Sequence, residues 1–336
     1  MKAPPAGELA VTPADVRAAA ARIAGLARRT PLLRCDALSE RAGREIYLKC
    51  ESMQRTGSFK FRGACNAVCL LPETDAPRGV VTHSSGNHAL ALAEAARVRG
   101  IPCHVVMPGN ASALKRRAVE RAGASVTTCG NTAAAREAAA EDVRTKTGAT
   151  MVPPYDHPWV IAGQGTIALE ILEELPGAEC IVVPVGGGGL IGGIAVAARA
   201  DRPAMRIVGA EPALADDAAA SKRLGSRQPQ RDPVTVADGL RAPLGRLTFP
   251  IVDRLVDDIA VVSEEEIVSA MRLAFEELRL VIEPSAAVGI AAVVEGRLGG
   301  RTQGPVACVV CGGNADLSAL PWRQGGTPGR DISPSW

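Results

Sequence analysis

The sequence predicts an α/β protein with two domains, each built on a mostly parallel sheet that is flanked by helices. Its 336 residues are enough for two domains with separate cores. From Gly79 onward, short runs rich in Val and Ile alternate with Ala-rich stretches of helical length. This alternation is typical of βαβ units, and therefore of parallel strands.

The order of the expected elements divides the chain. Three consecutive strand–helix units lie close together, and we expect them to form a small domain at residues 78–155. An amphipathic helix at 13–29, a strand at 45–51 and the later units at 156–325 complete a large domain together with the remainder of residues 1–77. The tail at 326–336 is rich in Pro, Gly and Ser, and we expect it to be disordered.

Composition excludes several classes of function. Basic and acidic residues number 38 and 36 and are well mixed, so nothing indicates a nucleic-acid or membrane-surface partner. No apolar run reaches the ~18 residues of a membrane span, and the start lacks a signal-like apolar segment. The nine cysteines are scattered, which favours free thiols and a cytoplasmic location.

The segment from Gly57 to Ala64 places Lys60 between Phe59 and Phe61. Burial and the neighbouring cation of Arg62 both disfavour an ammonium group, so we expect the pKa of Lys60 to be lowered. A neutral amine is a nucleophile that condenses with aldehydes. The alternative is a lysine that extends to solvent from the start of a helix.

Two polar turns follow predicted strands and precede predicted helices. The glycines at positions 186–189 let backbone N–H groups converge at a helix N-terminus, which favours a phosphate site; close packing of helix on sheet is the alternative. The turn with Ser84, Ser85, Asn87 and His88 suits a carboxylate or an oxyanion, or is simply a well-capped helix.

These segments, together with Glu-Pro-Ser-Ala-Ala from Glu283 and the Gly-Gly-Asn that ends at Asn314, resemble the β-family, or fold type II, of pyridoxal-phosphate enzymes. Within that family the chain is most similar to serine racemase and the serine/threonine dehydratases. The resemblance covers residues 12–320 and rests on five motifs in the family's order.

The resemblance implies a role for each motif. Lys60 holds pyridoxal 5'-phosphate as a Schiff base and takes the Cα proton, while Phe59 packs beside the ring. Asn87 hydrogen-bonds the phenolic oxygen, and Gly186, Gly187, Gly188 and Gly189 bind the phosphate. The substrate carboxylate is surrounded by Ser84, Ser85 and His88.

The resemblance also places Cys311 beside the pyridine nitrogen, where a thiol is too weak an acid to protonate the ring and elimination is favoured. It further implies a divalent cation at Glu211, Asp217 and the carbonyl of Ala215. These oxygen ligands suit Mg²⁺ or Ca²⁺, with Mn²⁺ as a further candidate, although two acids in a loop are commonly just solvated. Leu90 stands where nucleotide-activated animal racemases carry a glutamine, so activation by ATP is not expected.

The function that follows is β-elimination of water from a β-hydroxy amino acid, such as L-serine or L-threonine, to give a 2-oxo acid and ammonia. Ser85 stands where serine racemases carry a serine that serves as a second acid/base group, so we also expect serine racemase activity. Dehydration of 3-hydroxyaspartate and a β-replacement reaction of the cysteine-synthase type are the alternatives, and a phosphate-binding module with a structural Lys60 is the non-enzyme alternative. The family is commonly homodimeric.

Overall fold

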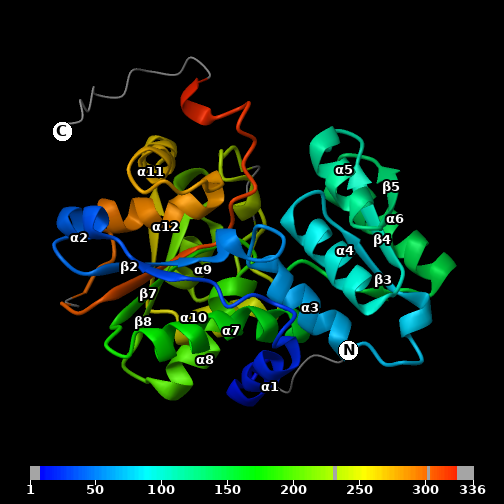
Figure 1. Ribbon diagram of the computed structural model, residues 1–336, viewed down its shortest axis with the longest axis horizontal. Helices are drawn as coiled ribbons and strands as arrows, with labels where there is room; N and C mark the ends of the chain where they lie inside the picture. The colour runs from blue at the N-terminus through cyan, green and yellow to red at the C-terminus, as the bar shows by residue number, and fades with distance from the viewer. Residues whose placement is uncertain (1–7, 230–232, 301–302, 324–336) are drawn as a thin grey trace.

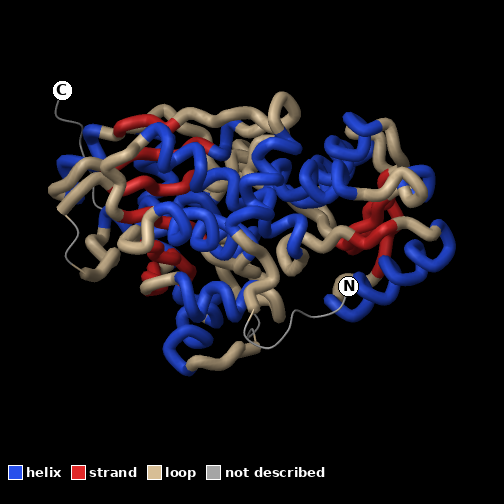
Figure 2. Tube along the Cα trace, turned by 90° about the horizontal axis from the view of Figure 1, so that it is seen from below, coloured by secondary structure: helices blue, strands red, loops and turns tan. Residues whose placement is uncertain are grey.

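The computed structural model describes residues 8–229, 233–300 and 303–323, so the predicted disordered tail lies outside the described residues. Within them two sheets form, and Figures 1 and 2 show them side by side, with helices around each. Among these residues no helix is both long enough and apolar enough to cross a bilayer.

The larger sheet has six strands in the order β1-β2-β10-β7-β8-β9. β1 is antiparallel to β2, and the other pairs are parallel. The strands are β1 (Leu32–Arg34), β2 (Ile46–Cys50), β7 (Cys180–Pro184), β8 (Arg206–Pro212), β9 (Asp258–Val262) and β10 (Val306–Val310).

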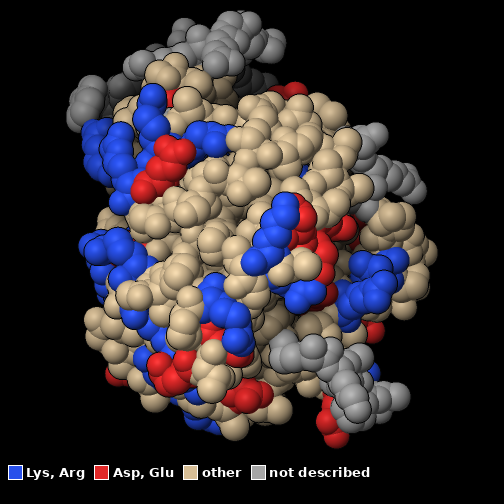
Figure 3. All heavy atoms as spheres, turned by 90° about the vertical axis from the view of Figure 1, so that its right-hand side faces the viewer, with Lys and Arg blue, Asp and Glu red and all other residues tan. Residues whose placement is uncertain are grey.

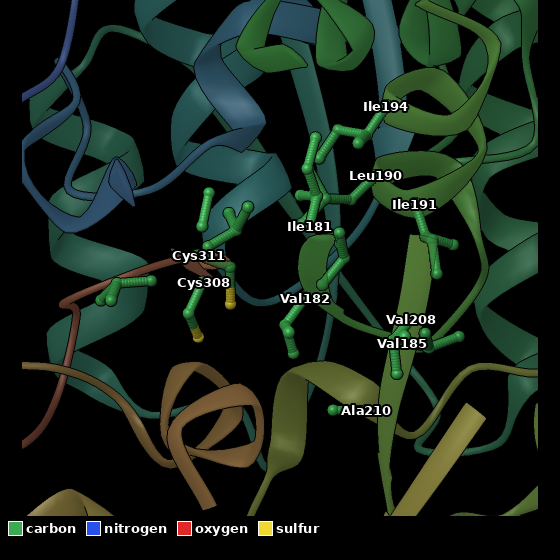
Figure 4. Packing of buried hydrophobic residues seen from close by; sticks show 14 of the residues in the cluster. Ile181, Val182, Val185, Leu190, Ile191, Ile194, Val208, Ala210, Cys308 and Cys311 are labelled. Atoms are coloured by element: carbon green, nitrogen blue, oxygen red, sulfur yellow. The ribbon is translucent and has the colours of Figure 1, made fainter. Parts of the chain in front are cut away.

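Helices cover both faces of this sheet (Figure 1), as a sheet whose strands are buried on both sides requires. One face carries α1 (Pro13–Ile23), α7 (Pro158–Glu174), α8 (Gly189–Asp201) and α10 (Thr248–Leu255), and the other carries α2 (Asp36–Ala42), α11 (Glu264–Glu276) and α12 (Pro284–Val294). The short helix α9 (Asp217–Leu224) follows β8. Figure 4 shows the side chains of β7, β8 and α8 packed together, with Cys308 and Cys311 at the adjoining strand.

The smaller sheet has four parallel strands in the order β5-β4-β3-β6. Its strands are β3 (Val80–His83), β4 (Cys103–Pro108), β5 (Ser125–Cys129) and β6 (Thr150–Met151), and its helices are α4 (Asn87–Arg99), α5 (Ala113–Arg121) and α6 (Ala133–Thr147). All of these elements fall inside the range expected for the small domain, and the domain boundaries themselves stay a prediction. Figure 3 shows basic and acidic side chains interspersed on the face at this end of the molecule.

Helix α3 (Lys60–Leu70) joins the two halves. Its apolar side chains, including Phe61 and Val68, belong to the same buried cluster as Leu92 of α4 and Val105 of β4. The core of the smaller sheet therefore includes a helix that precedes it in sequence. This places the first residue of α3, Lys60, between the two sheets.

The ends of two helices follow from local backbone features, and one of them differs from the prediction. The first helix was expected over 13–29 but ends at Ile23, because Ala24 is extended and Gly25 takes a φ of 75° that a helix does not accommodate. Helix α7 begins at Pro158, with proline in its first turn. His157 caps it by accepting a hydrogen bond from the backbone N–H of Trp159.

Candidate active site between the two sheets

Lys60 is the first residue of α3 and lines a cavity between the sheets. Its Nζ donates to the carbonyl oxygen of Pro154 at 2.8 Å and lies 5.0 Å from the centre of the Phe59 ring. Burial lowers the pKa of Lys60 to about 8, against the opposing influence of Cys311 and Glu283. A substantial fraction of this amine is therefore neutral near pH 8, as a nucleophile or a proton acceptor requires.

The backbone before Lys60 is tied to the end of β10, which fixes where the lysine starts. Phe59 N–H donates to Cys311 carbonyl at 3.0 Å, and Ser58 forms a β-bridge with Gly312. The carboxyl ends of parallel strands are where ligands bind in open α/β sheets, and these two backbone contacts place Lys60 at that edge of the sheet.

The prediction that Arg62 helps to lower the pKa of Lys60 is wrong. The guanidinium of Arg62 is buried in ion pairs with Glu51 and Glu170, and its charge is not among the causes that act on Lys60. Burial alone accounts for the direction of the shift.

The four glycines follow β7 and end at Gly189, the first residue of α8, and they line the same cavity as Lys60. Two of them are required by their surroundings. Gly188 has a φ of 83°, and a Cβ on Gly187 would lie 2.4 Å from the ring of Tyr155. The N-terminus of α8 directs its positive end at this turn, so the turn fits the phosphate group that the resemblance implies.

The polar turn after β3 contributes only some of its side chains to the cavity. Ser84, Asn87 and His88 line it, whereas Ser85, in the same turn, is not among the lining residues. His88 is buried, its Nε2 bonds the carbonyl of Val152 at 2.9 Å, and burial lowers its pKa to about 3. A neutral imidazole that donates through Nε2 leaves Nδ1 without a proton, so the ring in this orientation has no N–H for a carboxylate. The carboxylate-binding role of His88 therefore stays a prediction that this geometry does not support.

Asn87 is held in one orientation by two neighbours. Its Nδ2 donates to both carboxylate oxygens of Glu283 at 2.8 and 2.9 Å, and its Oδ1 accepts from Asn314 Nδ2 at 2.8 Å. Glu283 therefore sets the orientation of the Asn87 amide nitrogen, which is the atom that would donate to the phenolic oxygen of the cofactor. Burial raises the pKa of Glu283 to about 7, so this carboxyl titrates close to neutrality.

Glu283 is the main residue of the cavity whose contacts the sequence did not predict. Glu283 belongs to the Glu-Pro-Ser segment that carries the resemblance, but from the sequence it is only the residue that precedes a helix. The contacts of Pro154, Tyr155 and Asp156 were not predicted either, because no sequence motif marks a contact made by a backbone carbonyl or an aromatic ring.

Cys311 follows β10 and lines the cavity. Burial, reinforced by Glu283, raises the pKa of its thiol well above the ordinary value. The group is therefore a protonated thiol near neutrality, consistent with the weak partner for a ring nitrogen that the resemblance implies.

The predicted cation ligands lie away from Lys60, where β8 passes into α9. Burial raises the pKa of Glu211 to about 9 and that of Asp217 to about 6. Backbone N–H groups of Ala218 and Ala219 donate to Glu211. Among the described residues the buried carboxylate oxygens of Asp217 accept no hydrogen bond of ordinary geometry, although the backbone of Leu244 partly opposes the effect of burial on the pKa. Buried carboxylates with unused lone pairs fit a hard cation.

A metal site built from nitrogen or sulfur ligands is not an alternative to this oxygen site in the described parts of the chain. No group of three or more His, Cys, Asp or Glu side chains gathers there in a way that could hold a metal ion. A cation at Glu211 and Asp217 would need a backbone oxygen such as that of Ala215 as a further ligand.

The model of the family described as "Pyridoxal-phosphate dependent enzyme" matches residues 23–312. The chain therefore belongs to the pyridoxal-phosphate-dependent enzymes, and its fold is that of fold type II, with Lys60 and the glycine turn in one cavity.

Within this family the chain is similar to serine racemases. It is 44% identical over 314 residues to serine racemase from Oryza sativa subsp. japonica, which covers 92% of each chain. It is 45% identical to the beta-hydroxyaspartate dehydratase of Paracoccus denitrificans, over 92% of this chain and 98% of that one. The solved structure of maize serine racemase superposes with a TM-score of 0.91 at 42% identity, over 94% and 96% of the two chains.

Proposed function

We propose that this enzyme eliminates water from L-serine and L-threonine to give a 2-oxo acid and ammonia, and that it also interconverts the enantiomers of serine. The observation that carries the proposal is the primary amine of Lys60, with its pKa lowered to about 8, in one cavity with a tetraglycine turn. The identity to serine racemases over nine-tenths of the chain supports the substrate class.

Pyridoxal phosphate, when bound, supplies the electron sink that makes the Cα–H bond of an amino acid acidic. The residues of this chain then divide the remaining work. Lys60 would hold the cofactor aldehyde and, once displaced by the substrate amine, accept the Cα proton. Asn87, oriented by Glu283, would fix the tilt of the ring. The Cys311 thiol stays protonated and would withdraw little charge from the cofactor ring, which favours early loss of the substrate hydroxyl.

Racemisation needs an acid/base group on each face of the planar carbon, because one group returns the proton to the face that it left. On the strength of the family resemblance we propose Ser85 for the face opposite Lys60; its neighbour Ser84 lines the cavity, whereas Ser85 itself does not. In Ser85→Ala, racemisation and elimination of D-serine should fall sharply, about 10²-fold, while elimination of L-serine survives in part. Chiral chromatography and 2-oxo acid release measure the two; equal loss of both would mean that Ser85 only positions substrate.

A second candidate substrate is 3-hydroxyaspartate. The relative in Paracoccus denitrificans supports it, and so does Lys115, which lines the cavity as a cation besides Lys60. Its Nζ is paired with Asp238 at 2.9 Å, so a substrate carboxylate would have to compete with that pair.

One assay separates these functions. The kcat/KM for 2-oxo acid formation is measured with L-serine, D-serine, L-threonine and 3-hydroxyaspartate. A preference for serine and threonine supports the main proposal, and a preference for 3-hydroxyaspartate favours the second candidate. Product that forms only when sulfide is added would instead identify a β-replacement enzyme of the cysteine-synthase type.

We also propose that Glu211, Asp217 and the carbonyl of Ala215 bind a divalent cation, Mg²⁺ or Ca²⁺ before Mn²⁺. Support comes from the buried, unpartnered oxygens of Asp217 and from the raised pKa of both acids, since a cation would remove the cost of burying two negative charges.

A homodimer, on the strength of the family resemblance, and a cytoplasmic location, on the strength of the scattered cysteines, complete the proposal. Sedimentation of the purified enzyme tests the assembly, and a monomer that retains full activity would overturn it.

A further inference from the structure

Residues 152–156 connect β6 of the smaller sheet with α7 of the larger half, and we call them the crossover strap. Two of its carbonyls hold polar side chains of the active site. The Val152 carbonyl is bonded to His88 Nε2 at 2.9 Å, and the Pro154 carbonyl accepts from Lys60 Nζ at 2.8 Å. The strap therefore provides fixed partners for two side chains of the cavity.

The next residue of the strap, Tyr155, packs on the glycine turn. A Cβ at Gly187 would lie 2.4 Å from the Tyr155 ring, and a Cβ at Gly189 would lie 3.0 Å from its Cβ. Glycine is needed at these places because the strap occupies the space that side chains would fill. The shape of the turn and the position of the strap thus depend on each other.

Asp156 anchors the strap to a third element. Its carboxylate accepts from the backbone N–H groups of Arg246 at 2.9 Å, Leu247 at 2.8 Å and Thr248 at 3.3 Å, at the start of α10. The hydroxyl of Thr248, which is buried, donates to the carbonyl of Gly187 at 2.7 Å. Asp156 thereby reaches the glycine turn by a second path, through α10.

We infer that Asp156 is a positioning residue that holds the Lys60 amine and the glycine turn in register through the crossover strap. A lysine side chain has many rotamers, and a fixed acceptor at Pro154 selects among them. Pro154 is two residues from the anchor and Tyr155 one, so loosening the anchor moves both contacts together. The inference rests on the roles proposed for Lys60 and the glycine turn.

Two probes separate these contacts in the full-length protein freed of cofactor. Pyridoxine 5'-phosphate carries the phosphate but no aldehyde, so its affinity reports the glycine turn. Pyridoxal carries the aldehyde but no phosphate, and its attachment to Lys60 is counted by borohydride reduction and peptide mass spectrometry. Asp156→Asn is nearly isosteric and weakens three charge-assisted hydrogen bonds. The matched control is Glu179→Gln, since Glu179 also accepts two backbone N–H groups, at 3.1 and 2.9 Å, but far from the cavity.

We expect Asp156→Asn to lower the affinity for pyridoxine 5'-phosphate and the attachment of pyridoxal by about tenfold each, with Glu179→Gln unchanged in both. A folded Asp156→Asn that keeps either property at the wild-type level overturns the inference. If that variant is recovered unfolded, Thr248→Val decides: weaker pyridoxine 5'-phosphate binding supports the inference, and unchanged binding overturns it. Wild-type protein that binds neither probe would instead refute the proposed roles of Lys60 and the glycine turn.

Discussion

Lys60 and Arg62 are two residues apart at the start of α3, and the fold shifts the pKa values of their side chains in opposite directions. The Lys60 amine lies against the cavity wall with the neutral carbonyl of Pro154 as its hydrogen-bond partner, and burial lowers its pKa to about 8. Burial by itself also lowers the pKa of Arg62, but Glu51 and Glu170 outweigh it and raise the value above the ordinary one.

The environment of Arg62 is a fully paired network. Its side chain is 1% exposed and makes two bidentate pairs, with Glu51 at 2.8 and 2.9 Å and with Glu170 at 2.6 and 2.9 Å. Lys49, also fully buried, adds a pair with Glu170 at 2.7 Å. Burial therefore does not decide the charge of a side chain; the presence of an opposite charge does. One turn of helix therefore carries an amine whose pKa is lowered and a guanidinium that two carboxylates hold charged.

The largest expected effect is the loss of activity in Lys60→Ala. The proposed Cα proton acceptor and the group that holds the cofactor are the same amine, so turnover and the visible absorption of the bound cofactor should both disappear. The melting temperature of the cofactor-free protein should stay within a few degrees of wild type, because no ion pair is broken. Ordinary turnover in this variant would contradict the proposed role of Lys60.

Arg62→Met, in contrast to Lys60→Ala, should greatly lower the free energy of unfolding. It leaves Glu51 buried without its partner, and breaking a buried ion pair from one side costs about 3–5 kcal/mol. Denaturant unfolding of the cofactor-free protein measures this cost. The double variant Arg62→Met/Glu51→Gln should recover part of it, and a single variant as stable as wild type would mean that the network is not an anchor.

Cation binding at Glu211 and Asp217 extends the comparison to unpaired acids. Both pKa values are raised by burial, so the folded state binds more protons than the unfolded state from about pH 4 up to about pH 9 for Glu211 and about pH 6 for Asp217. Stability without cation should therefore fall as pH rises through this window. Added Mg²⁺ or Ca²⁺ should stabilise the protein more at pH 8 than at pH 6, because fewer protons must leave.

Thermal unfolding with EDTA, Mg²⁺ or Ca²⁺ at the two pH values measures this effect. Asp217→Ala serves as the control and should show no response to either cation. Wild type that responds to neither cation at pH 8 would identify these residues as a buried acidic pair without a metal function.

The smallest expected effect is a shift of the pH profile in Glu283→Gln. The negative charge of Glu283 raises the pKa of Lys60, so its removal should move the acid limb of the kcat profile to lower pH, because kcat reports groups of the enzyme–substrate complex, in which the Lys60 amine would be free. The amide of Gln can still bond Asn87, which separates the charge of Glu283 from its positioning role. A profile that coincides with wild type would mean that Glu283 does not act on the titrating group.

The sequence by itself determined the fold class, the cofactor family and the order of the site segments. Alternation of strand and helix lengths is a local property, and so is a lysine between two phenylalanines or a run of four glycines after a buried strand. Each is readable without tertiary structure because backbone conformation and side-chain size act over a few residues. For this reason Lys60 and the glycine turn could be singled out from the sequence, and the structure places both in one cavity.

Tertiary structure alone decided which neighbours each charge meets. Lys60 and Arg62 are near-equivalent in sequence, yet Glu170 comes from a helix more than one hundred residues away and reaches Arg62 but not Lys60. Glu283 meets Asn87 across the interface between the two halves, and Pro154 meets Lys60 from the crossover strap. The free energy of a charge depends on solvent and on opposite charges within a few ångströms. Those distances are set by how the sheets and helices pack, not by the spacing of residues along the chain.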